Sequence, residues 1–239
     1  MESPAYLVLG ATHSGRRAAV FDLIKDLASE SDPVEVAISK REPPSVYDER
    51  IPALEGVALN YFATDLGSLP SRGLRAGSTS ILIAAGAMNP VDQVESLKAL
   101  LGLAKKELGR ILSVVSCRML SRHPSLSAYY DACIHFSDVV LINERESVGE
   151  KFVKDFIQRY KDDYYPCLFE PMKRGRVKNP SLILETQARR ISLYFDPEED
   201  LSEEEDHESI PVDPYLDRLP GGIRRKTVPD IAKILGEGA

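Results

Sequence analysis

A glycine-framed loop near the start of the chain carries residue types that could hold an anion. It follows the apolar run Tyr6–Leu9 and precedes a helical pattern of apolar residues. The free backbone N–H groups at the start of a helix form the positive end of the helix dipole, and a negative charge bound there is stabilised. The candidate residues for binding a phosphate or nucleotide are therefore Gly10, Ala11, Thr12, His13, Ser14, Gly15, Arg16 and Arg17.

This loop has the G-x-x-x-x-G-K-[ST] frame of a P-loop, but both residues with chemical roles differ. In that frame the lysine reaches the outer phosphates and the Ser/Thr hydroxyl binds magnesium. Arg16 can supply the cation, whereas Arg17 has no hydroxyl to offer a metal. We therefore expect anion binding without a magnesium site, and the alternative is a plain tight turn that binds nothing.

Apolar runs alternate with helical patterns along most of the chain. This order predicts a three-layer α/β fold with a mainly parallel sheet of P-loop NTPase type. The runs Ile81–Ile83 and Val139–Ile142 fit strands that are buried on both faces. The predicted strands are 5–9, 34–38, 57–62, 80–84, 111–116, 139–143, 165–169 and 191–195, and the main predicted helices are 15–29, 91–108, 127–136 and 147–162.

Charge divides the chain into two parts. The net charge is −7, and residues 196–239 hold 13 acidic against 5 basic side chains. Nine of these carboxylates lie within 196–208, which has almost no apolar residue to bury. We expect one P-loop NTPase-like domain over 1–195 and a flexible, acidic, largely unstructured tail over 196–239.

Composition also bears on location and partners. No apolar run approaches the roughly 18 residues of a membrane helix, and the N-terminus lacks the features of a signal peptide. The basic cluster over 173–190 has no interleaved aromatic residues of the kind that stack on bases. The sequence predicts a cytoplasmic protein that binds neither membrane nor nucleic acid.

Three later segments follow the loop in a recognisable order. They are Ile83–Pro90, Val114–Cys117 and Ser137–Glu146, each beginning in or after an apolar run. With the loop they resemble the CobW family of P-loop GTPases and metallochaperones, over roughly residues 5–185. The resemblance implies GTP or another nucleotide as ligand, and it places Asn143 and Glu146 at the base-binding positions of the N-K-x-D motif.

The chain departs from this family at the positions that carry catalysis. Ile83 stands where an acidic residue is expected, Glu144 replaces the lysine of N-K-x-D, and the C-x-C-C metal motif is absent. The resemblance therefore implies a degenerate member with no catalytic residue, no metal ligand and a lost magnesium site. Hydrolysis is expected to be slow or absent, a weak GTPase at most. The expected role is regulatory or metallochaperone-like, with a small anionic ligand or nucleotide and a possible protein partner.

A second resemblance gives an alternative. The run Val8–Arg16 is similar to the G-A-T-G-x-x-G-R turn of NAD(P)-binding atypical short-chain reductases. His13 stands where their second glycine lets the backbone approach the pyrophosphate. No Tyr-x-x-x-Lys follows, because Cys133 and Ile134 come four residues after Tyr129 and Tyr130. The reductase interpretation is kept as the alternative to a GTPase relative.

Overall fold

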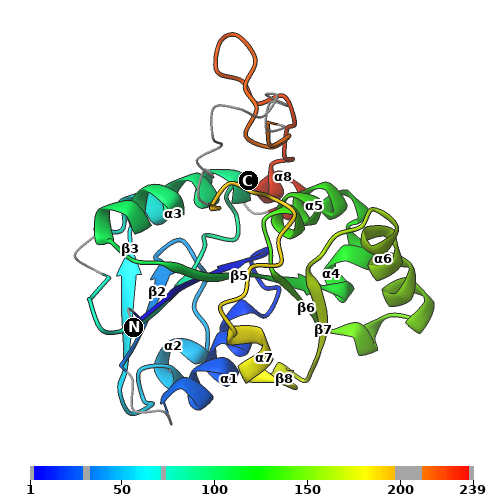
Figure 1. The fold of residues 1–239 in the computed structure, drawn as a ribbon. Coiled ribbons are helices and arrows are strands. Elements are labelled where there is room, and N and C mark those ends of the chain that lie inside the picture. The colour runs from blue at the N-terminus through cyan, green and yellow to red at the C-terminus, as the bar shows by residue number, and fades with distance from the viewer. Residues whose placement is uncertain (1–2, 29–32, 71–73, 197–211, 237–239) are drawn as a thin grey trace.

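The computed structural model describes residues 3–28, 33–70, 74–196 and 212–236, and shows a central sheet with helices on both faces (Figure 1). Within these residues eight strands form one sheet in the order β3-β2-β4-β1-β5-β6-β7-β8, with β1 to β7 parallel and β8 antiparallel to β7. The strands are β1 (Ala5–Leu9), β2 (Val34–Ser39), β3 (Val57–Phe62), β4 (Thr79–Ile83), β5 (Leu108–Ser116), β6 (Val139–Asn143), β7 (Leu168–Lys173) and β8 (Arg176–Val177).

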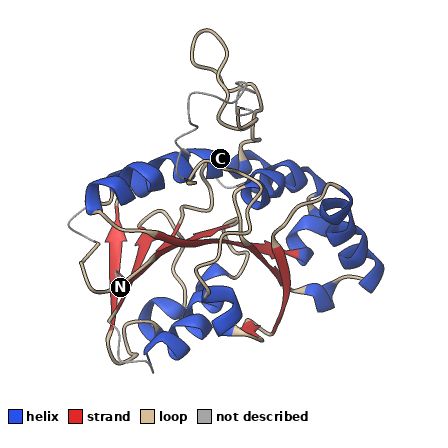
Figure 2. Ribbon diagram, viewed as in Figure 1, coloured by secondary structure: helices blue, strands red, loops and turns tan. Residues whose placement is uncertain are grey.

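Helices cover both faces of the sheet, and as a result β1, β2, β4 and β6 are buried along their whole length. α1 and α7 pack against one face, and α3, α5 and α6 pack against the other (Figure 2). The α-helices are α1 (Arg16–Ala28), α2 (Tyr47–Arg50), α3 (Pro90–Ala104), α4 (Cys117–Arg122), α5 (Ser127–His135), α6 (Glu150–Asp162), α7 (Pro180–Leu184) and α8 (Ile231–Leu235), and the short 3₁₀ turns are η1 (Leu66–Ser68), η3 (Pro124–Leu126) and η4 (Arg145–Ser147).

The strand register brings the loops at one edge of the sheet together. Ile83 of β4 pairs with both Val8 of β1 and Ile38 of β2. The residues that follow these three parallel strands therefore leave the sheet side by side. This edge holds the glycine-framed loop, and ligands of open α/β sheets bind at the same edge.

The predicted fold class is confirmed, with two errors among the strands. The strand expected at 165–169 begins at Leu168 and runs on to Lys173, where it turns into β8. Residues 191–195 form no strand. Instead Tyr194 and Phe195 are half-buried against the core, and the Tyr194 carbonyl accepts a hydrogen bond from Lys98 in α3.

The strand order contradicts the reductase alternative. A dinucleotide-binding sheet of that type has the order 3-2-1-4-5-6, in which the first two strands are neighbours. Here β4 lies between β1 and β2 and hydrogen-bonds to both. The chain therefore does not have the sheet that the alternative requires.

The C-terminal region differs in part from the unstructured tail expected over 196–239. Most of its acidic run, 197–211, lies outside the described residues. Residues 212–236 return to the domain, where Tyr215 and Ile231 are each 1% exposed within the core cluster. His135 Nε2 lies 2.9 Å from Asp213 Oδ2, which also accepts a hydrogen bond from Ser192. The division at residue 195 stays a prediction.

None of the described helices combines the length and apolar character needed to cross a membrane. A cytoplasmic location stays a prediction from the sequence.

Candidate functional site

The loop between β1 and α1 depends on two glycines in the left-handed region of backbone conformation. Gly10 has φ 131° and Gly15 has φ 99°. A Cβ atom on Gly10 would lie 2.5 Å from the Val114 carbonyl oxygen, and one on Gly15 would lie 2.2 Å from Asn143 Nδ2. His13 also adopts a positive φ, 64°, which is unfavourable for a residue other than glycine. The loop backbone thus packs closely against the Val114 carbonyl and the Asn143 side chain, at a conformational cost.

Arg16 is buried against a carboxylate that comes from a different loop. Its side chain is 3% exposed, and Nη2 donates to Glu42 Oε2 at 2.7 Å, while Nη1 donates to the Ala84 carbonyl. Glu42 is 6% exposed, and its Oε1 accepts the Gly86 N–H at 2.6 Å. The Arg16 guanidinium thus already binds an anion, and this anion is a carboxylate of the chain itself.

Both members of this pair are charged. Burial alone would raise the pKa of Glu42, but Arg16, the Gly86 N–H and Arg17 together outweigh it and hold that pKa below the usual range. Burial would likewise lower the pKa of Arg16, and the Glu42 carboxylate reverses this effect, so the pKa is raised. The contact is therefore a buried ion pair.

Arg17 points toward the same segment of chain. Its Nη1 donates to the Pro43 carbonyl at 2.7 Å and to Asp48 Oδ2 at 3.1 Å, and its Nη2 lies 3.9 Å from Glu42 Oε2. The two arginines of the loop are thus both engaged by residues 42–48. This segment covers the side of the loop on which the arginines lie.

The turn after β4 rests directly on the loop. Thr12 N donates to the Gly86 carbonyl at 3.3 Å, and a Cβ on Gly86 would lie 2.4 Å from Thr12 N and 2.2 Å from Arg16 Nη2. Ser14 Oγ is buried here and has no hydrogen-bond partner among the described residues. An unsatisfied buried hydroxyl costs free energy unless a ligand or water pairs with it.

The structure brings only one of the two expected base-binding residues to the loop. Asn143 Nδ2 donates to the Ser14 carbonyl at 2.9 Å. Glu146 is exposed in η4 and lines a separate groove. Glu144 lies between them in the left-handed conformation, where it pairs with Arg118 at 2.7 Å and accepts a hydrogen bond from Ser116. The base-binding role of Asn143 and Glu146 stays a prediction.

A hollow of about 300 Å³ opens over the loop, and a larger one of about 880 Å³ lies beside α6. The two share no lining residue. The smaller hollow is lined by His13, Gly15, Arg16, Arg17, Ala18, Glu42, Pro43, Pro44, Ser45, Tyr47 and Arg118.

Neither of the two positions at which a magnesium-binding residue is expected carries an oxygen ligand. Arg17 holds the position of the hydroxyl ligand and is turned toward Asp48. Ile83, at the expected acidic position, is buried and apolar. Magnesium prefers oxygen ligands, and neither side chain offers one.

Glu42 is the site residue that the sequence interpretation missed. It lies three residues after the end of β2, and Ile38 of β2 pairs with Ile83 of β4. Residues 40–42 therefore leave the sheet beside the turn that contains Gly86. The signal was a single carboxylate just after a predicted strand, and only the strand order shows that it faces Arg16.

Comparison with solved structures defines the class of fold. The signal recognition particle receptor FtsY from Elizabethkingia anophelis, in complex with GDP, matches with a TM-score of 0.55 and 12% identity over 78% of this chain and 64% of that one. A zinc-bound triple mutant of the YjiA GTPase gives a TM-score of 0.51 and 11% identity over 78% and 62%. FtsY from Thermotoga maritima gives 0.51 and 13% over 77% and 68%.

The chain therefore has the α/β fold of P-loop GTPases. It spans slightly less than two thirds of the FtsY chain from Elizabethkingia anophelis and of the YjiA chain. No protein-family model and no curated protein sequence matches it.

The lowered pKa of Glu42 predicts how its contribution depends on pH. A carboxylate with a lowered folded-state pKa stabilises the fold above its unfolded value of about 4.3, and this contribution is lost as pH falls through the folded value. The difference in unfolding free energy between the parent and Glu42→Gln should be largest near neutral pH and shrink below about pH 4. Urea unfolding at several pH values measures this, and a difference that does not change with pH would contradict an ionised Glu42.

Proposed function

We propose that this chain is a non-hydrolysing relative of the P-loop GTPases that binds a nucleotide or other phosphate ligand at residues 10–17. The observation that carries the proposal is the Glu42 carboxylate held by Arg16 and the Gly86 N–H at 2.7 and 2.6 Å. In a P-loop the residue at the position of Arg16 reaches the outer phosphates. On this proposal Glu42 takes the place of a phosphate oxygen, and its two contacts support anion binding by these groups.

Ligand binding then requires Glu42 to leave. A ligand phosphate and the Glu42 carboxylate would compete for one guanidinium and one N–H, because the Arg16 side chain is only 3% exposed. Apparent affinity is reduced by the fraction of molecules in which the site is open. Release of Glu42 would also move residues 43–48, which Arg17 holds. This coupling suits a regulatory or chaperone-like role in which a protein partner senses the movement. We place the chain as a degenerate member of the CobW-like group.

Turnover is not expected. The chemistry of phosphoryl transfer depends on magnesium and on a positioned water, and Arg17 and Ile83 replace residues that serve them. The ligand would therefore be held rather than consumed.

Isothermal titration with phosphate, pyrophosphate, GDP and GTP, each with and without magnesium, tests the proposal. Glu42→Gln should bind at least about tenfold more tightly than the parent, because the competing charge is gone. Magnesium should make no difference. The matched control is Glu49→Gln, an exposed carboxylate in α2 that does not line the hollow, and it should behave as the parent.

Two results would reject the proposal. One is no saturable binding of any of these ligands by the parent or by Glu42→Gln. The other is a magnesium-dependent GTPase rate of about 1 per second or faster, in the ordinary range for enzymes.

A further inference from the structure

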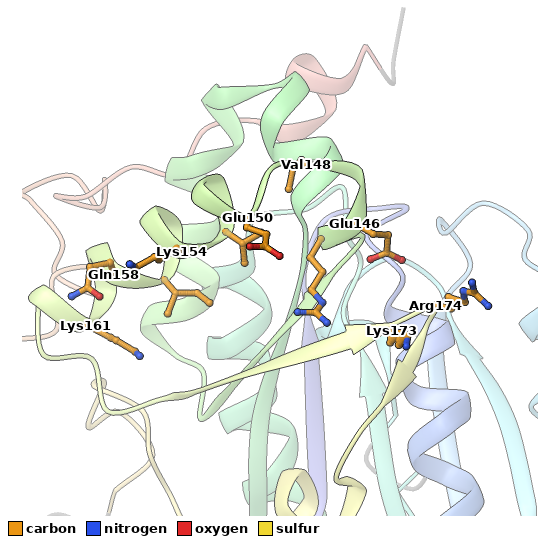
Figure 3. Close-up of a pocket in the computed structure, with 11 residues that line it drawn as sticks. Glu146, Val148, Glu150, Lys154, Gln158, Lys161, Lys173 and Arg174 are labelled. Carbon is orange, nitrogen blue, oxygen red and sulfur yellow. The ribbon is translucent and has the colours of Figure 1, made fainter.

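A groove beside α6 shares no lining residue with the hollow over the proposed ligand site. It has a volume of about 880 Å³ and lies between one side of α6, the η4 turn and the turn after β7. Figure 3 shows Glu150, Lys154, Gln158 and Lys161 following one another along α6, with Lys173 and Arg174 at the turn after β7.

Positive side chains outnumber negative ones in this groove. Five cations line it, namely Arg145, Lys154, Lys161, Lys173 and Arg174, against the two carboxylates Glu146 and Glu150. Within the described part of the chain, none of these seven side chains forms an ion pair.

The neighbouring surface behaves differently. Arg159, on another face of α6, pairs with Asp131 at 2.5 Å, and Arg118 pairs with Glu144 at 2.7 Å. Arg159 and Arg118 are thus paired within the chain, whereas the five cations of the groove have no ion-pair partner among the described residues.

The floor of the groove is apolar. Val148, Val153 and Ile157 are half-buried and line it, and Val153 and Ile157 are one helical turn apart. An occupant that gained from both surfaces would carry apolar side chains on one face and carboxylates along its flanks.

The far wall is held in a fixed shape. Arg174 and Gly175 connect β7 to β8 with φ 51° and 76°, beside the paired residues Lys173 and Arg176. Two positive φ values in a two-residue connection are typical of a type I′ hairpin turn, where asparagine or glycine is preferred. An arginine therefore holds the first turn position at a conformational cost, with its charge beside the groove.

We propose that this groove docks an acidic amphipathic helix of a partner protein. The wall formed by α6 from Glu150 to Lys161 is about 16 Å long, which matches three turns of a second helix packed alongside. Such a helix would place apolar residues at i, i+3, i+4 and i+7 on the floor, and carboxylates against the five cations. A single-stranded nucleic acid is disfavoured because no aromatic side chain lines the groove. A lipid surface is disfavoured because the feature is concave, whereas membrane-surface helices project an apolar face.

Docking here would act next to the proposed ligand site. Arg145 and Glu146 directly follow Glu144 and Asn143, and Asn143 bonds to the Ser14 carbonyl of the loop. The docking proposal itself does not depend on whether the loop binds a ligand.

Fluorescence anisotropy with a labelled model peptide tests the proposal on the full chain. The probe is a blocked peptide of about 18 residues with leucine on one helical face and glutamate on the others. The parent should bind it saturably at about 50 mM salt and more weakly at higher salt, because exposed charges are screened. The double variant Lys154→Glu/Lys161→Glu should bind at least about tenfold more weakly, because two attractive contacts become repulsive.

The matched control is Lys151→Glu/Lys178→Glu, which makes the same change of charge at exposed lysines outside the groove. It should bind the peptide within about threefold of the parent, since only long-range charge is altered. Circular dichroism of all three proteins checks that they are folded. Hydrogen exchange should show protection of α6 amides by the peptide.

Four results would overturn the proposal. The first two are no saturable peptide binding by the parent and an equal loss of peptide affinity in both double variants. The others are equal affinity for a scrambled peptide of the same composition, and tighter binding to phosphatidylserine vesicles or to a single-stranded oligonucleotide than to the peptide.

Discussion

Replacing Glu42 by glutamine is expected to destabilise the ligand-free chain by about 3–5 kcal/mol at neutral pH, the usual cost of breaking a buried ion pair from one side. Arg16 would keep its charge at 3% exposure and lose the carboxylate that compensates it. For a chain of this size the midpoint of thermal unfolding should fall by roughly 6–20 °C. The Glu49→Gln control, on the exposed surface of α2, should stay within about 0.5 kcal/mol of the parent.

Phosphate should restore much of this loss. An anion that binds the folded state alone stabilises it by about 2.7 kcal/mol at a concentration of one hundred times Kd. Because Glu42→Gln opens the site, its unfolding midpoint should rise with phosphate more steeply than that of the parent. Calorimetry across a phosphate series measures both slopes, with chloride at matched ionic strength as the control.

A double variant separates the lost charge pair from lost packing. Arg16→Met/Glu42→Gln removes the buried cation together with its partner, so no uncompensated charge remains. It should be more stable than Glu42→Gln alone, and it should no longer respond to phosphate. Equal stability of the parent and Glu42→Gln would show that the ion pair does not hold the site closed.

The sheet could be predicted from the sequence where strands are buried on both faces. Continuous runs such as Ile81–Ile83 and Val139–Ile142 leave little choice of structure when they alternate with helical patterns. The segment 191–195 shows where such reasoning fails. Ser192 is buried while Ile191 and Leu193 are 38% and 58% exposed, because Ser192 donates to Asp213, which is 21 residues further along. A local pattern contains no information about that partner.

The candidate site likewise has one part that could be predicted from the local sequence and another that depends on the strand order. The frame of Gly10 and Gly15 between a strand and a helix could be read locally, and the close contacts at both glycines explain it. The role of Glu42 could not be predicted locally, because its position opposite Arg16 depends on β4 lying between β1 and β2. Glu146 was placed by a motif, yet the 3₁₀ turn η4 carries it into the groove beside α6.

For the acidic run the expectation from composition stays a prediction, and for the residues beyond it composition did not predict the contacts with the domain. The carboxylates of 196–208 argue against a packed core, and most of that segment lies outside the described residues. Two apolar anchors, Tyr215 and Ile231, then attach 212–236 to the domain. Tyr215 follows a proline and has no periodic pattern around it, so its burial follows from the surface that receives it.

Replacing Tyr215 by alanine is therefore expected to cost about 3–5 kcal/mol of stability, as for other large buried aromatic residues. Its ring lies 4.9 Å from that of His135 and 6.0 Å from that of Phe136, and its N–H donates to Asp213 Oδ1 at 3.0 Å. Tyr215→Phe keeps the ring and should cost less than about 1.5 kcal/mol. Val212→Ala is the control within the same segment, because Val212 is 68% exposed and should change stability by no more than about 0.5 kcal/mol.

Urea unfolding of these variants decides whether 212–236 belongs to the domain. A tail that folds independently of the domain, or not at all, would leave the unfolding free energy of Tyr215→Ala unchanged. A segment that completes the core would lower it, because His135 at the end of α5 and Phe136 just after it would then face a cavity. Truncation after Phe195 extends the argument, since it removes Tyr215, Ile231 and the carboxylate beside His135 together. A truncated chain with the stability of the parent would support a domain that ends at 195, whereas a loss at least as large as that of Tyr215→Ala places the C-terminal residues inside the folding unit.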